Sequence, residues 1–297
     1  MIQPAFLKKG DKVAIVCTAR SFSVEEAQAG IELFQSWGLE VVLGKTVGQN
    51  NYQLAGTDKE RADDFQAMLN DPSIKAIWMA RGGYGSVRIV DQIDFSVFAQ
   101  SPKWIIGFSD ITVWHSHLHT LGFQTLHAIM PYSVPNATPE AKETLRKALF
   151  GEKMQIEAPC HPLNIQGKVK GTLIGGNLSI IYSLLATPSE INYHDKILFV
   201  EDLCEALYHV DRMFYSLKRS GKLQQIKGLI VGGMTDMSYN EIPFNNTVEE
   251  IIYHHTKDIG IPLCFDFPAG HIPDNRALVF GKEVKLYVDK QNTLLLQ

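Results

Sequence analysis

The segment KWIIGFSDITVWHSHLHTLG, residues 103–122, contains the pattern that decides the fold. An apolar run reaches Phe108 and helical spacing follows within a few residues, so a buried strand leads directly into a helix. Ser109 lies at this junction, where it could cap the helix with Asp110 in the first turn. It could equally be a nucleophile on a strand-to-helix turn. The nucleophile pattern G-x-S-x-G is incomplete, because Ile111 stands in place of the second glycine.

Strands and helices alternate through the first half of the chain. The apolar runs have the length of buried strands, and the segments between them carry helical periodicity. This alternation predicts βαβ units around a largely parallel sheet, in which ligand sites lie at the carboxyl ends of the strands. We expect strands at residues 12–17, 39–44, 74–80 and 103–108, with helices at 23–38 and 58–71.

The second half mixes β runs with helices. Proline punctuation changes the texture of the sequence after residue 131, so we predict a boundary near residue 150 and two domains, 1–150 and 151–297. Residues 158–171 have the character of a connecting segment, and Gly281 predicts a hairpin turn, so the second domain is expected to be α+β. Its β runs are expected at 170–175, 196–202, 226–234, 262–271 and 277–288, and its helices at 206–221 and 245–260.

The composition is that of a globular protein of 297 residues, 45% hydrophobic and 20% charged, with a formal net charge of −4. Mild acidity argues against nucleic acid as the main partner, because phosphate binding needs surplus lysine and arginine. No signal-peptide pattern and no membrane-length apolar run is present, so no membrane partner is expected. Four scattered cysteines without CxxC spacing favour a reducing, cytoplasmic location. They are Cys17, Cys160, Cys204 and Cys264.

A nucleophilic serine needs a base, and a further group to orient that base. His271 follows the apolar run 262–270 at a strand-to-loop position, where an irregular backbone can aim a side chain. A turn histidine bonded to its own backbone is the alternative. His115 and His119 share a helix face at a spacing also seen in zinc helices, but the sequence offers no obvious third ligand. No metal is therefore expected.

The orienting acid is expected at the end of the strand near residue 200. Glu201 closes an apolar run, where a carboxylate is costly unless it is paired or has a function. Asp202 and Glu205 are rivals, and either could instead favour the start of the following helix. Ser109, Glu201 and His271 all fall at strand ends, in the chain order seen in α/β-hydrolases.

The glycine-rich stretch RGGYGS, residues 81–86, follows the predicted strand 74–80. Glycines allow backbone N–H groups to approach a ligand closely. An oxyanion hole and a phosphate cradle are both compatible with this stretch, and a tight turn is the structural alternative. The Walker pattern GK[ST] and the Rossmann pattern G-x-G-x-x-G are both absent from it.

Together these motifs resemble the successive blocks of the LD-carboxypeptidase family, which contains murein tetrapeptide carboxypeptidases and microcin-immunity peptidases. The resemblance covers nearly the whole chain and implies a flavodoxin-like N-terminal domain with a largely parallel sheet. It also implies a smaller, β-rich C-terminal domain. The opening VCTARSFS departs from the APSS-like start common in the family, which bears on a possible cleft wall. The matching blocks are residues 80–86, 105–115, 171–188, 197–217 and 265–284.

The resemblance assigns roles to individual residues of a serine peptidase that needs neither metal nor cofactor. Ser109 would be the nucleophile, His271 the general base and Glu201 the acid that orients the base. The backbone N–H groups of Gly83 and Asp110 would form the oxyanion hole.

The family reaction hydrolyses an amide between an L-centre and a terminal D-residue, as when D-alanine leaves the murein tetrapeptide during wall recycling. Such a substrate ends in a carboxylate, which an arginine can hold through paired hydrogen bonds. Arg81, Arg212 and Arg276 are the candidates, and each could instead be a structural ion-pair partner. Two other functions stay open: a peptidase that detoxifies a peptide–nucleotide antibiotic, and a non-catalytic module that senses wall fragments. The family also suggests a homodimer.

Overall fold

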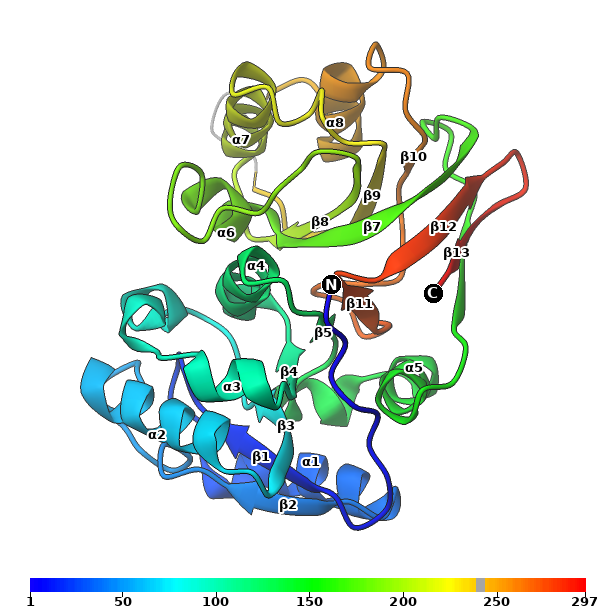
Figure 1. Ribbon diagram of the computed structural model, residues 1–297. Helices are drawn as coiled ribbons and strands as arrows, with labels where there is room; N and C mark the ends of the chain where they lie inside the picture. The colour runs from blue at the N-terminus through cyan, green and yellow to red at the C-terminus, as the bar shows by residue number, and fades with distance from the viewer. Residues whose placement is uncertain (239–243) are drawn as a thin grey trace.

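The protein, described here by a computed structural model over residues 1–238 and 244–297, is organised around two β-sheets (Figure 1). Five strands of the first sheet are parallel and follow the spatial order β2-β1-β3-β4-β5, and β11 is added antiparallel to β5. This is the flavodoxin strand order, so the predicted N-terminal fold is confirmed. The strands are β1 (Lys12–Val16), β2 (Glu40–Leu43), β3 (Ile74–Met79), β4 (Trp104–Gly107), β5 (Thr125–His127) and β11 (Leu278–Phe280).

Helices cover both faces of the first sheet. α1 (Val24–Ser36) and α5 (Pro139–Phe150) pack on one face, and α2 (Asp58–Asn70), α3 (Ser96–Gln100) and α4 (Thr112–Thr120) pack on the other. α1 and α2 begin at capping boxes, in which a serine or threonine and a glutamate three residues later bond each other's backbone N–H groups. Both helices start within two residues of the positions that their periodicity predicted.

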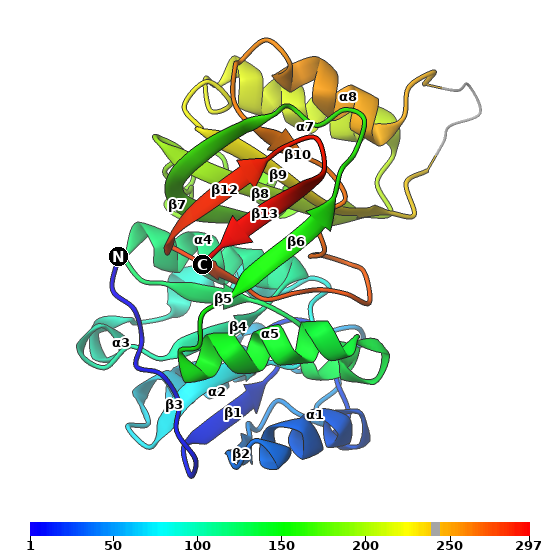
Figure 2. The ribbon, with the colours of Figure 1, turned by 90° about the vertical axis from the view of Figure 1, so that its right-hand side faces the viewer.

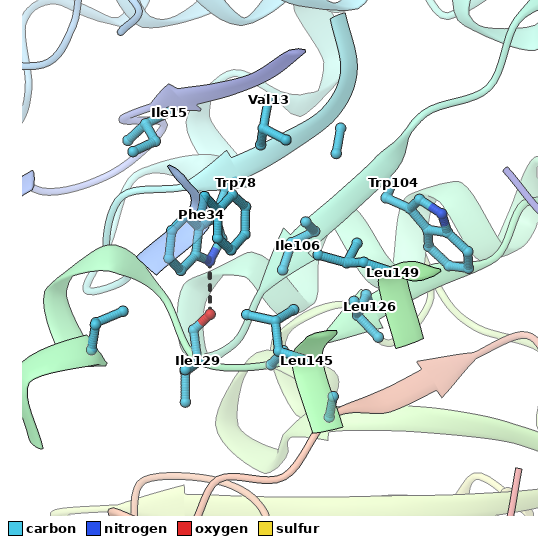
Figure 3. Close-up of a cluster of buried hydrophobic side chains, with 14 of the residues drawn as sticks. Val13, Ile15, Phe34, Trp78, Trp104, Ile106, Leu126, Ile129, Leu145 and Leu149 are labelled. Carbon is cyan, nitrogen blue, oxygen red and sulfur yellow. Dashed lines mark hydrogen bonds between the residues drawn. The ribbon is translucent and has the colours of Figure 1, made fainter. Parts of the chain in front are cut away.

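The core under α1 is built around Trp78 on β3 (Figure 3). Its ring stacks on Phe34 with centroids 4.0 Å apart, and its indole N–H donates to the carbonyl of Ile129 at 2.8 Å. The buried indole therefore has its single donor satisfied, and it ties β3 to the segment after β5.

The second sheet is mixed. β7 (Gly167–Asn177), β8 (Lys196–Leu203), β9 (Gly228–Thr235) and β10 (Leu263–Cys264) are parallel, and β12 (Glu283–Val288), β13 (Asn292–Leu296) and β6 (Gln155–Pro159) extend it antiparallel (Figure 2). α7 (Leu207–Arg219) and α8 (Val248–Thr256) cover the face away from the first sheet (Figure 1). α6 (Leu178–Ser183) lies beside α4. The β-rich α+β prediction is confirmed.

Two local predictions in the second half are wrong. The segment 158–171 is strand at both ends, because β6 ends at Pro159 and β7 begins at Gly167. Gly281 does form a turn, but the strands on either side do not pair with each other: β11 belongs to the first sheet and β12 to the second. The turn is fixed by partners in both sheets, since the Gly281 N–H donates to the Leu173 carbonyl at 2.7 Å and its carbonyl accepts from Gln124.

The chain crosses from the first sheet to the second between Phe150, where α5 ends, and Gln155, where β6 begins. We keep 1–150 and 151–297 as a proposed division, with β11 as the segment that returns to the first sheet. Across the described ranges 1–238 and 244–297, no helix combines the length and apolarity that crossing a bilayer requires.

Candidate active site

Ser109 lies where the sequence pattern predicts, on a sharp turn between β4 and α4. Its φ of 67° is in the left-handed region, which costs a non-glycine residue about 1–2 kcal/mol. The helix-cap interpretation is wrong, because Ser109 makes no capping hydrogen bond and Ile111 occupies the N-cap position of α4 without a side-chain bond. The strained turn instead presents the hydroxyl to a residue from the second half of the chain.

That residue is His271. Its Nε2 lies 3.1 Å from Ser109 Oγ, and its Nδ1 lies 2.6 Å from Glu201 Oε2. The His271 backbone N–H donates to the same Glu201 oxygen at 3.2 Å. A carboxylate oxygen can only accept, so Nδ1 carries the imidazole proton and Nε2 is free to accept the hydrogen bond from the Ser109 hydroxyl. The structure thus brings together all three residues predicted from strand ends.

The surroundings of His271 stabilise the protonated form of its imidazole more than water does. Burial acts to lower the pKa of His271, but the Glu201 charge and hydrogen bond, together with the Asp202 charge, outweigh it, so this pKa lies above its usual value. The side chain of Glu201 is fully buried and that of His271 is 15% exposed. The ring of Phe108 lies against the imidazole with centroids 4.8 Å apart. Such an imidazole is stabilised in the charged form that a general base acquires.

The junction of the two sheets sets the distance between serine and acid. Asn177, the last residue of β7, pairs in register with Glu201 on β8. Its backbone N–H donates to Thr112 Oγ1 at 2.9 Å, and Thr112 is the first residue of α4, three positions after Ser109. Gly176 makes this approach possible, because a Cβ there would overlap the Thr112 side chain. One hydrogen bond therefore connects the element that carries Ser109 to the strand pair that carries Glu201.

The rival acids have other partners. Asp202 accepts hydrogen bonds from Asn177 Nδ2 at 2.8 Å and from the Ser179 N–H at 2.9 Å, which anchors the start of α6. Burial, followed by the Glu201 charge, raises the pKa of Asp202 to about 7. Glu205 instead pairs with His209, four residues later, with Oε2 2.5 Å from the imidazole Nδ1.

The helix histidine with zinc-like spacing is engaged in the fold. His115 Nδ1 lies 2.9 Å from Thr125 Oγ1, and its Nε2 lies 2.8 Å from the Gly107 carbonyl. Both nitrogens therefore bridge α4 to the neighbouring strands. Among the described residues, no three His, Cys, Asp or Glu side chains are grouped as metal ligands would be.

The glycine stretch lies directly against Ser109, but through Gly82, a glycine that the sequence did not single out. A Cβ on Gly82 would lie 2.7 Å from Ser109 Cβ and 3.4 Å from the Asp110 backbone nitrogen. Gly83 has a φ of 108°, and a Cβ there would meet the side chain of Arg20. The stretch thus borders both Ser109 and the amide of Asp110, the region in which an oxyanion hole is predicted.

A cavity of about 280 Å³ opens beside His271. Phe108, Tyr132 and Ile272 give it apolar walls, and Asn136 is among its polar lining residues. The mixture of apolar walls and a few polar groups is typical of small-molecule sites.

None of the three candidate arginines is among the residues that line this cavity. The Arg81 guanidinium lies 4.2 Å from the centroid of the Tyr132 ring, which lines the cavity. Arg276 is paired with Asp274 at 2.9 Å, and Arg212 lies over the Tyr208 ring at 5.1 Å.

Asn275 is a site residue that sequence reasoning missed. Its side chain is buried beside the cavity, and its Oδ1 accepts the N–H of Gly270 at 2.8 Å, immediately before His271. It therefore fixes the loop that carries the imidazole. An asparagine in a loop has many ordinary uses, so no signal in the sequence separates this one from the others.

Fold and site together define a class of protein: an α/β protein whose serine, histidine and glutamate are arranged as in serine hydrolases. Family models for the LD-carboxypeptidase N-terminal and C-terminal domains match residues 13–128 and 170–286. The chain is 31% identical to the "Probable murein peptide carboxypeptidase" of Bacillus subtilis over 99% of this chain and 94% of that protein. It is 28% identical to the murein tetrapeptide carboxypeptidase of Pseudomonas aeruginosa, over 93% of this chain and 92% of that one.

A solved structure agrees with these relatives. The muramoyltetrapeptide carboxypeptidase from Oxalobacter formigenes superposes with a TM-score of 0.88 at 25% identity, covering 96% of this chain and 98% of that one. The chain therefore belongs to the LD-carboxypeptidase family.

Proposed function

We propose that the protein is a metal-independent serine LD-carboxypeptidase that releases terminal D-alanine from the murein tetrapeptide. The observation that carries the proposal is the continuous hydrogen-bonded arrangement Ser109 Oγ–His271 Nε2 and His271 Nδ1–Glu201 Oε2, at 3.1 and 2.6 Å. Support for the substrate comes from the relatives named for murein peptides.

The mechanism follows from the donors and acceptors present. Ser109 Oγ attacks the amide carbonyl while His271 Nε2 removes its proton, and Glu201 stabilises the resulting imidazolium. The backbone N–H groups of Gly83 and Asp110 stabilise the oxyanion. The imidazolium then gives its proton to the nitrogen of the departing D-alanine, leaving an acyl-enzyme. Water, deprotonated by His271, hydrolyses that ester and restores the serine.

Recognition of the terminal carboxylate is assigned first to Arg81. Its guanidinium stacks on Tyr132 at the wall of the cavity beside His271, and its Nη1 makes only a long, 3.4 Å bond to the Ser21 carbonyl. Its remaining donors can therefore turn toward a carboxylate. Arg276 already uses its Nε and Nη2 donors on Asp274, and Arg212 stacks over Tyr208 of its own helix, α7.

A substrate panel tests the proposal. The protein is incubated without added metal with L-Ala-D-Glu-meso-diaminopimelate-D-Ala, with the same peptide ending in L-alanine, with the lysine-containing peptide and with a peptidyl nucleotide. Mass spectrometry follows the terminal alanine that each peptide releases. We expect release of D-alanine from the first peptide and no release of L-alanine from its epimer. Cleavage of the peptidyl nucleotide alone would contradict the assignment and indicate the detoxifying peptidase.

A non-catalytic sensor is separated by a covalent probe. An activated serine reacts with a fluorophosphonate, whereas a binding module has no reason to activate one. We expect stoichiometric labelling at Ser109, located by peptide mass spectrometry. A folded protein that binds murein peptide without labelling would contradict the enzyme.

We also propose a cytoplasmic, homodimeric protein. Each of the four cysteines is a free thiol, which agrees with a reducing compartment. Cell fractionation tests the location, and sedimentation velocity at micromolar concentration tests the dimer. Recovery of the protein in a secreted fraction would contradict the cytoplasmic location. A sedimentation coefficient of a monomer would contradict the homodimer.

A further inference from the structure

The carboxylate of Asp110 has no role in the mechanism above, which uses only its backbone N–H. It follows the nucleophile directly, yet it is 1% exposed. Its Oδ2 accepts the backbone N–H of Ser86 at 2.9 Å, and its Oδ1 has no hydrogen-bond partner. Burial is the largest cause that raises the pKa of this carboxyl. A buried carboxylate is costly, so its position calls for a compensating interaction.

Compensation comes from a guanidinium on the other side of the glycine stretch. Arg61 on α2 is fully buried, and its Nη1 donates to the carbonyls of Gly85 at 3.0 Å and of Thr18 at 2.6 Å. Its Nη2 pairs with Asp58, which also binds Arg88 just after the stretch. A buried cation is thus held by α2 against the backbone of residues 82–86.

The two charges act on one peptide group. Arg61 donates to the carbonyl of the Gly85–Ser86 peptide, and Asp110 accepts from its N–H. The peptide dipole therefore lies between a cation and an anion in the orientation that both favour, away from screening solvent. The Ser86 hydroxyl adds a lateral bond, since it accepts from the Trp114 indole at 3.0 Å.

We propose that Asp110 and Arg61 are positioning residues that clamp the Gly85–Ser86 peptide and thereby fix the oxyanion-hole donors against Ser109. The inference rests on the proposed function. One donor, the Asp110 N–H, belongs to the residue whose carboxylate holds the glycine stretch, and the other, the Gly83 N–H, belongs to that stretch. The Asp110 side chain therefore sets the separation of the two donors through a single hydrogen bond.

Substitutions test the clamp by whether they lower kcat while leaving KM nearly unchanged. Removing one oxyanion donor in a hydrolase costs about 10²–10³-fold in kcat. We expect Asp110→Asn, which keeps an acceptor but loses the charge, to lower kcat about tenfold, and Asp110→Ala to lower it about 100-fold or more. KM should change less than about threefold, because the clamp acts on the transition state. Arg61→Lys should retain more kcat than Arg61→Met.

Asp64 is the matched control. It is also a buried carboxylate that binds loop backbone, accepting the N–H groups of Lys45 at 3.0 Å and Thr46 at 2.9 Å after β2. Asp64→Asn should lower the melting temperature but keep kcat within about twofold of wild type. Equal losses of kcat in Asp64→Asn and Asp110→Asn would overturn the inference, as would unchanged kcat in a folded Asp110→Ala.

Fluorophosphonate labelling separates this inference from the substrate assignment, because the probe needs the oxyanion hole but no peptide. Slowed labelling in Asp110→Asn with no D-alanine release by wild type would support the clamp and contradict the murein substrate. If the Asp110 variants do not fold, amide exchange over residues 82–86 is measured in Arg61→Lys. Faster exchange together with slower labelling supports the clamp, and faster exchange with unchanged labelling overturns it.

Discussion

At the residue scale, the proposed chemistry depends on the strained Ser109 and on the hydrogen-bonded pair of His271 and Glu201. The pKa of His271 is raised by Glu201, against the effect of burial. Since the base must be neutral to accept the Ser109 proton, kcat/KM should fall as pH falls through this pKa. The midpoint should lie above 6.5, the ordinary value for histidine. In Glu201→Gln, only the Asp202 charge still opposes burial, so a proton NMR titration should give a lower His271 pKa than in wild type. A lower midpoint in wild type than in Glu201→Gln would contradict the assignment.

The contributions of His271 and Asp202 to stability should change with pH in the opposite sense to activity. A histidine with a raised folded-state pKa contributes stability that is complete below about 6.5 and is lost as pH rises through the folded value. Asp202 acts in the same direction, because burial raises its pKa to about 7 and the folded state keeps its proton at higher pH than the unfolded chain does. Buried histidines such as His115, whose pKa burial lowers to about 4, act in the opposite direction, so urea unfolding between pH 5 and 9 compares wild type with Asp202→Asn and with His271→Ala. The free energy of unfolding of wild type relative to each variant should decline as pH rises, and a rising difference would contradict the corresponding shift.

The sequence predicted the residue types at the site better than their geometry. Ser109, Glu201 and His271 could be chosen because strand ends concentrate ligand sites in open α/β sheets. That His271 lies 3.1 Å from a serine 162 positions earlier depends on the packing of two sheets, which periodicity does not encode. The same reason explains why Gly82, Asn275 and the Asp110 carboxylate were not singled out for their contacts: each acts through a non-local neighbour.

At the element scale, the contact between α4 and β7 sets the position of Ser109 relative to Glu201. Gly176 has a φ of 139°, and a Cβ there would overlap Thr112. Gly176→Ala should therefore destabilise the protein by about 2–4 kcal/mol from backbone strain and overpacking, and lower kcat by displacing Glu201 from Ser109. Denaturant unfolding and steady-state kinetics measure both effects.

Gly221 provides the control for that substitution. It also has a positive φ, of 75°, but a Cβ there would meet nothing within 4 Å. Gly221→Ala should cost only the strain of the left-handed conformation, about 1 kcal/mol, and leave kcat unchanged. If the two variants lose the same stability and activity, steric separation of α4 and β7 is not the cause.

Elements with strong local signals were predictable, and several short or edge elements were not. Of the four parallel strands before residue 110, β1, β3 and β4 are buried apolar runs, β2 is a partly buried edge strand, and the helices α1 and α2 begin at capping boxes. β5 has only three residues and was not predicted. β11 lies within the β run expected at 277–288, but its pairing with β5 joins segments far apart in the sequence, which a local pattern does not encode. β6 alternates exposed and buried residues at the edge of the second sheet, a pattern that polar connecting segments share.

At the scale of the whole molecule, β11 couples the two sheets. The strand belongs to the C-terminal half of the chain yet completes the first sheet, and Phe280 at its end packs against Phe199 of β8 with ring centroids 6.2 Å apart. The two proposed domains should therefore unfold in one calorimetric transition, with calorimetric and van't Hoff enthalpies nearly equal. Two resolved transitions in wild type would contradict this coupling.

A pair of cavity-forming substitutions refines that test. Phe280→Ala and Phe98→Ala each remove a buried ring, at a cost of about 3–5 kcal/mol. Phe98 packs within the first unit, under α2 and α4, whereas Phe280 lies between the two sheets. We expect Phe98→Ala to lower the single transition temperature and Phe280→Ala to split the transition into two. The reverse pattern would show that the coupling lies elsewhere.

The central claim is that Ser109 is the nucleophile of an LD-carboxypeptidase. The most direct measurement compares wild type and Ser109→Ala for D-alanine release from L-Ala-D-Glu-meso-diaminopimelate-D-Ala, without added metal, by mass spectrometry. The hydrogen-bonded triad predicts release by wild type and a loss of about 10³-fold or more in the variant, with both proteins folded. Equal release by the two proteins would contradict the role of Ser109, and no release by folded wild type would contradict the substrate.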